Sequence, residues 1–262
     1  MLSFKEVREL QKSRRARTER GLFAAEGLRI FREVPLSQIE GIFATDAFCA
    51  EHADLIGQAE RAGTAVERVS AQRMESISDT KTPQGVLAVI RKTEWSAETI
   101  LKADAPLILV LENLQDPGNL GTILRTAEAA GVNGIFVTDD TADRYNPKTV
   151  RGTMGSLFRM PCVDAGDTEA VAEELLPKLR ERGIVTCAAC MDGETTFWEE
   201  NFTGGCAFFI GNEGNGLSER LLRAADRTVR IPMRGAIESL NAATAAGLLM
   251  YEAARQRAAE NV

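Results

Sequence analysis

A continuous apolar segment, PLILVLENL at residues 106–114, constrains the fold of this chain more than any other feature. A run without polar alternation is typical of a strand that is covered on both faces, as in a parallel sheet. A DPGN turn follows, and then a helical pattern that ends at Gly131. Beyond it, a helical pattern at 167–183 lies among further strand-like runs, which are GIFVTD at 134–139, IVTCAAC at 184–190, CAFFIG at 206–211 and TVRIPM at 228–233. This alternation predicts an α/β fold with a parallel sheet and helices on both sides.

A smaller α/β unit precedes this region. Strand-like runs at residues 22–27, 39–46, 65–70 and 84–92 alternate with helical patterns at 27–34, 47–63 and 70–78. Residues 93–105 lack a strong strand pattern and lead into Pro106, so we expect a linker there. The sequence therefore predicts an N-terminal domain at 1–92 and a C-terminal domain at 106–262.

Composition favours a cytoplasmic globular protein. Of the 262 residues, 44% are hydrophobic and 26% are charged, which is ordinary for a folded domain. No apolar stretch approaches the roughly 18 residues of a membrane span, and the N-terminus is charged where a signal peptide would be apolar. The net charge is -7, yet residues 1–32 carry nine basic and four acidic side chains, a local excess of five positive charges. This basic stripe either binds a polyphosphate or forms the solvated face of a helix.

Cysteine and histidine usage argues against a metal site. The five cysteines are scattered, and only Cys187 and Cys190 form a CxxC pair. That pair lies in the apolar run at 184–190, where a buried strand is the better interpretation. The single histidine, His52, lies in a predicted surface helix and is expected to be solvated.

Three polar, glycine- or proline-containing loops each follow a predicted strand, which is where open α/β sheets bind ligands. They are DPGNLGTILR at 116–125, GNEGNGLSE at 211–219 and PMRGAIESLN at 232–241. The glycines of GNEGNG do not have the spacing of a dinucleotide fingerprint, and no GxxxxGK[ST] phosphate loop is present. Hydride transfer and nucleotide hydrolysis are therefore poorly supported.

Together, these loops resemble the motifs of the SpoU, or TrmH, family of RNA ribose 2'-O-methyltransferases, a branch of the SPOUT class. The family motif N-x-G-x-x-x-R-x-A is matched by Asn119, Gly121, Arg125 and Ala127, and the other two motifs are matched at 211–217 and 231–241. The resemblance spans residues 106–258 and implies a deep trefoil knot. Residues 15–91 resemble, more loosely, the L30e-like substrate-binding domain often fused to this catalytic domain.

The resemblance implies S-adenosylmethionine as the methyl donor. It would be bound by the second and third loops at Gly211, Ile231, Met233 and Leu240. For the three apolar residues, core packing is a compatible alternative, because an adenine site is itself largely apolar.

The resemblance also implies a catalytic pocket lined by Asn119, Arg125, Glu213, Ser239 and Asn241. Arg125 would be the base or its organiser. Because arginine stays protonated in proteins, it could instead clamp a phosphate and stabilise the developing oxyanion. Glu213 could hold Arg125 or Asn119 in place, or accept a proton. Asn119 and Ser239 could also cap the helices that follow them.

The basic stripe and the last helix suggest two partners. The likeness of the N-terminal part to a substrate-binding domain favours RNA contact by Arg14, Arg15 and Arg17. The last helix is apolar or small almost all round between Leu240 and Tyr251, which is typical of a core or an interface. Since the family dimerises through such helices, we expect a homodimer.

Several functions remain open at this point. The first is methylation of a ribose 2'-hydroxyl in structured RNA, with 23S ribosomal RNA as substrate and transfer RNA as the alternative. A non-catalytic RNA-binding protein with an inactive knot is a second class, against which the intact set of Asn119, Arg125, Glu213 and Asn241 argues. A dehydrogenase is the third, and the missing dinucleotide fingerprint disfavours it.

Overall fold

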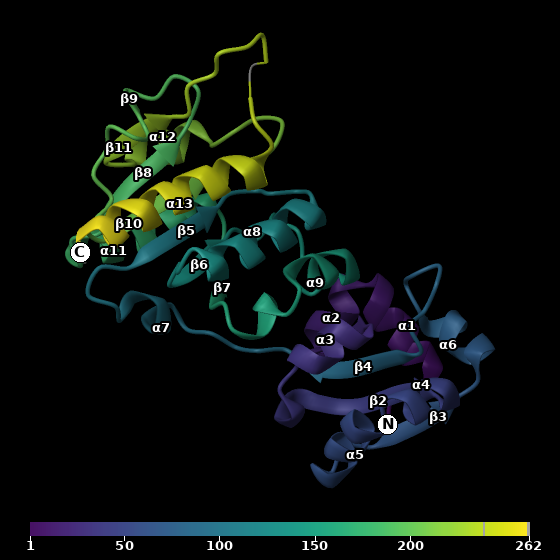
Figure 1. Cartoon of the computed structure of the whole chain (residues 1–262). Coiled ribbons are helices and arrows are strands. Elements are labelled where there is room, and N and C mark those ends of the chain that lie inside the picture. Colours follow the sequence, from purple (N-terminus) through teal and green to yellow (C-terminus); the bar gives the residue numbers. More distant parts are fainter. Residues whose placement is uncertain (238, 261–262) are drawn as a thin grey trace. The chain divides into compact units, whose positions relative to one another are not determined.

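The computed structural model describes residues 1–237 and 239–260, so Glu238 of the third motif lies outside the described residues. The chain forms two compact units (Figure 1). Unit 1 contains Met1–Thr93 and Asp143–Phe158, and unit 2 contains Glu94–Ala142 and the chain from Arg159 onward.

Unit 1 is built on a four-stranded sheet of order β1-β4-β2-β3. β4 pairs antiparallel with β1 and β2, while β2 and β3 are parallel. The strands are β1 (Leu22–Glu26), β2 (Ile39–Thr45), β3 (Val66–Val69) and β4 (Val86–Arg91). The helices are α1 (Phe4–Lys12), α2 (Arg14–Arg20), α3 (Leu28–Glu33), η1 (Leu36–Gln38), α4 (Asp46–Glu51), α5 (Ala53–Arg61), α6 (Ala71–Ile77), α9 (Pro147–Thr153) and η2 (Ser156–Phe158).

Both faces of this sheet are covered. Alternate residues of β4 enter two different clusters, Val86 and Ala88 on one side and Leu87 and Val89 on the other, as the two-residue period of a strand requires. The first cluster also contains side chains from residues 143–158, namely Tyr145, Val150, Leu157 and Phe158. That segment is therefore part of the core of unit 1.

The expected helix at 47–63 is interrupted at His52. α4 ends at Glu51 and α5 begins at Ala53, because His52 has φ -122° and ψ 40°, outside the helical region. The expectation of a solvated histidine is wrong. The side chain of His52 is only 15% exposed, and its ring centroid lies 4.5 Å from that of Phe48.

Unit 2 contains a seven-stranded parallel sheet of order β7-β6-β5-β10-β8-β11-β9, which confirms the predicted α/β class. The strands are β5 (Leu107–Leu111), β6 (Gly134–Val137), β7 (Cys162–Asp164), β8 (Val185–Ala189), β9 (Thr195–Thr196), β10 (Cys206–Ile210) and β11 (Arg227–Arg230). The helices are α7 (Ala97–Leu101), α8 (Pro117–Ala129), α10 (Thr168–Ala170), the π-helical η3 (Val171–Leu175), α11 (Leu176–Glu181), α12 (Glu219–Ala224) and α13 (Ala242–Glu260).

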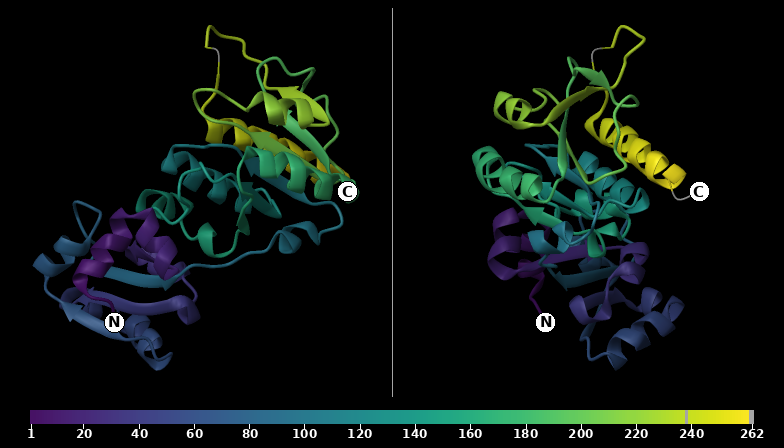
Figure 2. Two further views of the ribbon diagram at one scale, coloured as in Figure 1. Left: turned by 180° about the vertical axis from the view of Figure 1, so that it is seen from behind. Right: turned by 90° about the vertical axis from the view of Figure 1, so that its left-hand side faces the viewer.

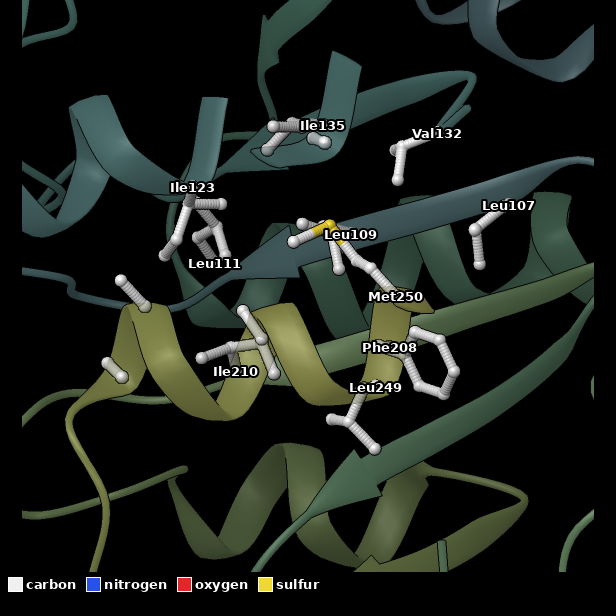
Figure 3. Packing of buried hydrophobic residues seen from close by; sticks show 14 of the residues in the cluster. Leu107, Leu109, Leu111, Ile123, Val132, Ile135, Phe208, Ile210, Leu249 and Met250 are labelled. Atoms are coloured by element: carbon white, nitrogen blue, oxygen red, sulfur yellow. The ribbon is translucent and has the colours of Figure 1, made fainter. Parts of the chain in front are cut away.

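Helices cover this sheet on both faces (Figure 2). Leu107, Leu109 and Leu111 of β5 pack with α8 and α13, as Figure 3 shows, whereas Ile108 and Val110 face a cluster that includes α7, α11 and α12. The apolar run at 106–114 is thus buried from both sides. Part of the segment expected as a linker, residues 97–101, forms helix α7 and buries two side chains in the second cluster.

Candidate functional site

The three motif loops leave the sheet of unit 2 at one edge. The first follows β5, the second follows the neighbouring strand β10, and the third follows β11, which pairs with β8 beside β10. Since all these strands are parallel, their carboxyl ends meet at the same edge, where ligands bind in open α/β sheets.

Glu213 of the second loop is hydrogen-bonded to the first loop. Its Oε2 accepts a hydrogen bond from the backbone N–H of Gln115 at 3.1 Å. Its Oε1 accepts from the backbone N–H of Asp116 at 3.1 Å and from Nδ2 of Asn119 at 2.9 Å. Of the two partners expected for Glu213, the structure places Asn119 in contact with it.

Asn241 brings the third loop to the same point. Its Nδ2 donates to Oδ1 of Asn119 at 2.9 Å, and its Oδ1 accepts from the backbone N–H groups of Ala243 at 2.9 Å and Thr244 at 3.3 Å. Asn241 is therefore the residue that caps α13. The expectation that Ser239 caps this helix is wrong. Ser239 is exposed two residues earlier in the loop.

The direction of this hydrogen-bond chain is set by the charge at its start. An ionised carboxylate only accepts, so Asn119 must turn its NH2 group to Glu213 and its carbonyl oxygen to Asn241. Asn241 must then donate its own NH2, which leaves its oxygen for the N–H groups of α13. We call Glu213, Asn119 and Asn241 the polar triad.

Hydrogen bonding keeps Glu213 ionised. Partial burial acts to raise its pKa, but the bonds from Asn119 and from backbone N–H groups outweigh burial, and the net result is a lowered pKa. A carboxylate that is already hydrogen-bonded through both oxygens is a poor proton acceptor. Glu213 is therefore suited to hold the loops together.

Arg125 lies on α8 away from the core. Leu120, Ile123, Leu124 and Ala127 of this helix are buried, whereas Arg125 is exposed and makes no hydrogen bond or ion pair with the described residues. Asp116 caps α8 by accepting from the backbone N–H groups of Gly118 and Asn119, so the alternative that Asn119 is this cap is wrong. Asn119 is thus not needed as the helix cap, and Arg125 is not part of the core.

The second loop can fold back on itself only because residue 211 is a glycine. A Cβ atom added at Gly211 would lie 2.1 Å from the backbone carbon of Gly216 and 2.2 Å from the nitrogen of Leu217. Asn212 closes the loop through backbone bonds with Gly216 and donates its Nδ2 to the carbonyl of Asn113 at 2.8 Å. Of the other predicted cofactor residues, the structure places Ile231, Met233 and Leu240 in half-buried positions.

Glu112 is a positioning residue that the sequence patterns did not reveal. This carboxylate is 3% exposed at the end of β5. It accepts from Oγ1 of Thr168 at 2.6 Å and from the backbone N–H of Ser218 at 2.7 Å, so it fixes the end of the second loop. An acidic residue directly after five apolar ones was the available signal, because a buried charge needs partners.

The three arginines expected to contact RNA differ in environment. Arg14 and Arg15 are exposed, and Arg15 pairs with Glu19. The expectation for Arg17 is wrong, because its side chain is only 3% exposed. Its Nε lies 2.6 Å from Oδ2 of Asp143, and its Nη1 donates to the carbonyl of Leu10. This buried ion pair fastens residues 143–158 within unit 1.

Of the cysteine pair, Cys187 belongs to the core, whereas Cys190 is half-buried just beyond the end of β8. Cys187 is buried in β8, and desolvation raises the pKa of its thiol to about 12. In the described part of the chain, no group of three His, Cys, Asp or Glu side chains is arranged to hold a metal ion. Nor does any helix among residues 1–237 and 239–260 have the length and apolar character to cross a membrane.

Comparison with known proteins explains this arrangement. Residues 106–251 match the SpoU rRNA Methylase family, and residues 3–88 match the MRM3-like substrate binding domain. Both matches agree with the resemblances seen in the sequence.

Relatives of known sequence and structure agree. A Synechocystis protein named an uncharacterized tRNA/rRNA methyltransferase, slr1673, is 35% identical over 97% of this chain and 90% of its own length. The 23S rRNA (guanosine(2553)-2'-O)-methyltransferase RlmP of Bacillus subtilis is 34% identical over 70% of each chain. The crystal structure of the SpoU methyltransferase AviRb from Streptomyces viridochromogenes with AdoMet superposes with a TM-score of 0.87 and 30% identity, covering 97% of both chains. The chain belongs to the SpoU rRNA methylase family.

Proposed function

We propose that this protein transfers the methyl group of S-adenosylmethionine to a ribose 2'-hydroxyl of RNA, with 23S ribosomal RNA as its substrate. One observation carries the proposal: the polar triad joins the three motif loops at the carboxyl edge of the sheet, and Arg125 is exposed on α8, the helix that begins in the first loop. The names of RlmP and of other relatives, which are 23S rRNA 2'-O-methyltransferases, support this substrate. A ribosomal substrate also fits the cytoplasmic location expected from the sequence.

The residues present fit the cofactor. Gly211 has no side chain, so its backbone can lie against Gly216 in the folded second loop. The half-buried Ile231, Met233 and Leu240 offer apolar surface to an adenine ring. We assign these four residues to S-adenosylmethionine. When bound, this cofactor supplies a methyl group activated by a positively charged sulfur.

In this mechanism the protein contributes position and charge. Arg125 holds the phosphate next to the target ribose and stabilises the negative charge that develops on the 2'-oxygen. The polar triad keeps the loops, and with them the reacting groups, in line. Because Glu213 is engaged through both oxygens, the hydroxyl proton leaves to solvent as the new bond forms. Ser239 lines the pocket from the third loop.

We further propose the roles of the larger parts. Residues 1–92 act as the RNA substrate-binding domain, which the match at 3–88 supports, 93–105 connect it, and 106–262 carry out the methyl transfer. The match of residues 106–251 to the SpoU family supports a carboxyl-terminal segment folded into a trefoil knot, as the resemblance implies. Arg14 and Arg15 remain candidates for RNA contact. A transfer RNA is the second candidate substrate, because the name of slr1673 includes tRNA.

Calorimetry with S-adenosylmethionine and with NAD tests the cofactor. We expect the first to bind and the second not to, in protein freed of ligand carried through purification. Arg125→Ala should lower methyl transfer by about 100-fold or more, the usual effect of removing an oxyanion-stabilising donor, while cofactor affinity stays within about twofold. Absence of S-adenosylmethionine binding, or full activity of this variant, would refute the proposal.

A further inference from the structure

A groove of about 400 Å³ runs along α1 in unit 1. Its wall consists of Phe4, Lys5, Arg8, Glu9, Lys12 and Ser13, with Ser76 of α6 on the opposite side. Lys5, Arg8 and Lys12 are exposed and follow the spacing i, i+3, i+7, so they lie along one face of the helix. At a rise of 1.5 Å per residue they span about 10 Å.

The groove is rigid because α1 is anchored on its other face. Val7 and Leu10 are fully buried among Phe43, Leu87 and Met74. At the start of the helix, the side chain of Ser3 accepts from the backbone of Glu6, and Glu6 reaches back to the backbone N–H of Ser3. The backbone positions from which the three cationic side chains extend therefore have a fixed spacing.

Positive charge predominates in this groove. Glu6 of α1 lies 2.9 Å from Nη1 of Arg20, and Glu9, which lies in the groove wall, is 4.0 Å from Nη2 of the same arginine. Within the described residues, the side chains of Lys5, Arg8 and Lys12 make no ion pair or hydrogen bond. Arg73 of α6 adds a fourth cation nearby, stacked 4.9 Å above the ring of Phe4.

We propose that this groove binds the sugar–phosphate backbone of the RNA substrate through Lys5, Arg8 and Lys12. The inference rests on the proposed function. It assigns the principal RNA contact of the basic stripe to α1 instead of to Arg14, Arg15 and Arg17. Arg17 is unavailable because it is buried, and Arg15 is already paired with Glu19. A row of unpaired cations on a rigid helix recognises a polyanion without reading its bases, which suits a domain that orients a large RNA.

The test measures how salt affects RNA binding. Binding of the full-length protein to a 23S rRNA transcript is measured over a series of KCl concentrations for wild type and for Lys5→Gln/Arg8→Gln/Lys12→Gln. Each lost phosphate contact should lower the slope of log K against log [salt] by about 0.7 to 0.9, hence by about two in total or more. At saturating RNA the variant should keep its kcat while its KM for RNA rises.

A matched control removes three exposed cations from unit 2, in Lys102→Gln/Lys178→Gln/Arg223→Gln, and its slope should equal that of the wild type. Equal slopes for the groove variant and the wild type would overturn the inference, as would a wild type that does not bind the transcript. Failure of the proposed function gives a different result: the wild-type protein would then not methylate the transcript, whatever the salt dependence of its RNA binding.

Discussion

At the scale of the residue, the site depends on a few charged or amide side chains whose partners fix what they can do. Glu213 accepts three hydrogen bonds and thereby sets the donor and acceptor directions of Asn119 and Asn241. Glu112, at the end of β5, holds the other end of the same loop. In the proposed mechanism, these contacts hold the loops around the reacting groups on which Arg125 acts.

Replacing Glu213 by Gln should disrupt the polar triad. A glutamine places an NH2 group where one backbone N–H already donates, so one of the bonds to the first loop is lost. We expect methyl transfer to fall by roughly tenfold or more, since each 1.4 kcal/mol of lost stabilisation corresponds to a factor of ten. The exposed Glu219→Gln serves as control and should retain full activity in the same assay.

The pH dependence of unfolding gives a second reading of Glu213. Its pKa in the folded protein lies below the usual 4.5, so its contribution to stability is present above that value. It is lost as the pH falls through the lowered pKa. Urea unfolding from pH 5 downward should therefore show a shallower loss of stability in Glu213→Gln than in the wild type. Identical profiles would mean that this carboxylate is not held as described.

Arg17→Ala should destabilise unit 1. Removing one partner of a buried ion pair leaves Asp143 uncompensated, which costs about 3 to 5 kcal/mol in other proteins. The neighbouring Arg15→Ala, on the surface, should change the free energy of unfolding by about 0.5 kcal/mol or less. Urea unfolding of the two variants checks both values. A similar effect for both would contradict the buried pair.

The motif residues could be located in the sequence, whereas their hydrogen-bond partners could not. The spacing of Asn119 and Arg125 in a helix and the glycines around Glu213 marked these residues before any geometry was known. The burial of Arg17 could not be predicted, because its partner, Asp143, lies 126 residues away and local sequence carries no signal of such a pair.

At the scale of the element, the strands were predictable because buried strands are continuous apolar runs in the sequence. Helix starts were less so. The caps of α8 and α13 are Asp116 and Asn241, each a few residues from the residue expected, because several polar side chains in these loops have the chemistry of a cap. At the break between α4 and α5, His52 packs against Phe48, and the local sequence had no signal of this break.

Gly211→Ala tests the second loop. Its Cβ would overlap the backbone of Gly216, so the loop must move, and overpacking of this kind costs about 1 to 3 kcal/mol. We expect the affinity for S-adenosylmethionine to fall by roughly tenfold or more. Gly204→Ala is the matched control, because no atom lies within 4 Å of a Cβ added there. Unchanged calorimetry for Gly211→Ala would remove this loop from the cofactor site.

At the scale of the whole molecule, the chain is divided in a way that local sequence does not reveal. Residues 143–158 carry sequence that resembles the catalytic family, yet they belong to the compact unit formed by the N-terminal part. Tyr145, Val150, Leu157 and Phe158 of this segment enter the core of unit 1, a placement that only the three-dimensional contacts reveal.

The association of two copies is a further prediction at this scale. Leu248 and Tyr251 of α13 are 40% and 52% exposed, one turn apart on the helix expected to form the dimer. Sedimentation velocity should show a dimer for the wild type and a monomer for Leu248→Glu/Tyr251→Glu, with circular dichroism unchanged. A wild type that sediments as a monomer at micromolar concentration would contradict this interface.

The central proposal for this protein is that the three loops and Arg125 methylate a sugar oxygen in RNA. The most direct measurement incubates 23S rRNA with the protein and isotopically labelled S-adenosylmethionine, digests the RNA, and identifies the labelled nucleoside by mass spectrometry. We predict one nucleoside labelled on its ribose 2'-oxygen, and a rate of labelling that is lower by about 100-fold or more with Arg125→Ala. A label on a base, or none with the wild-type protein, would contradict it.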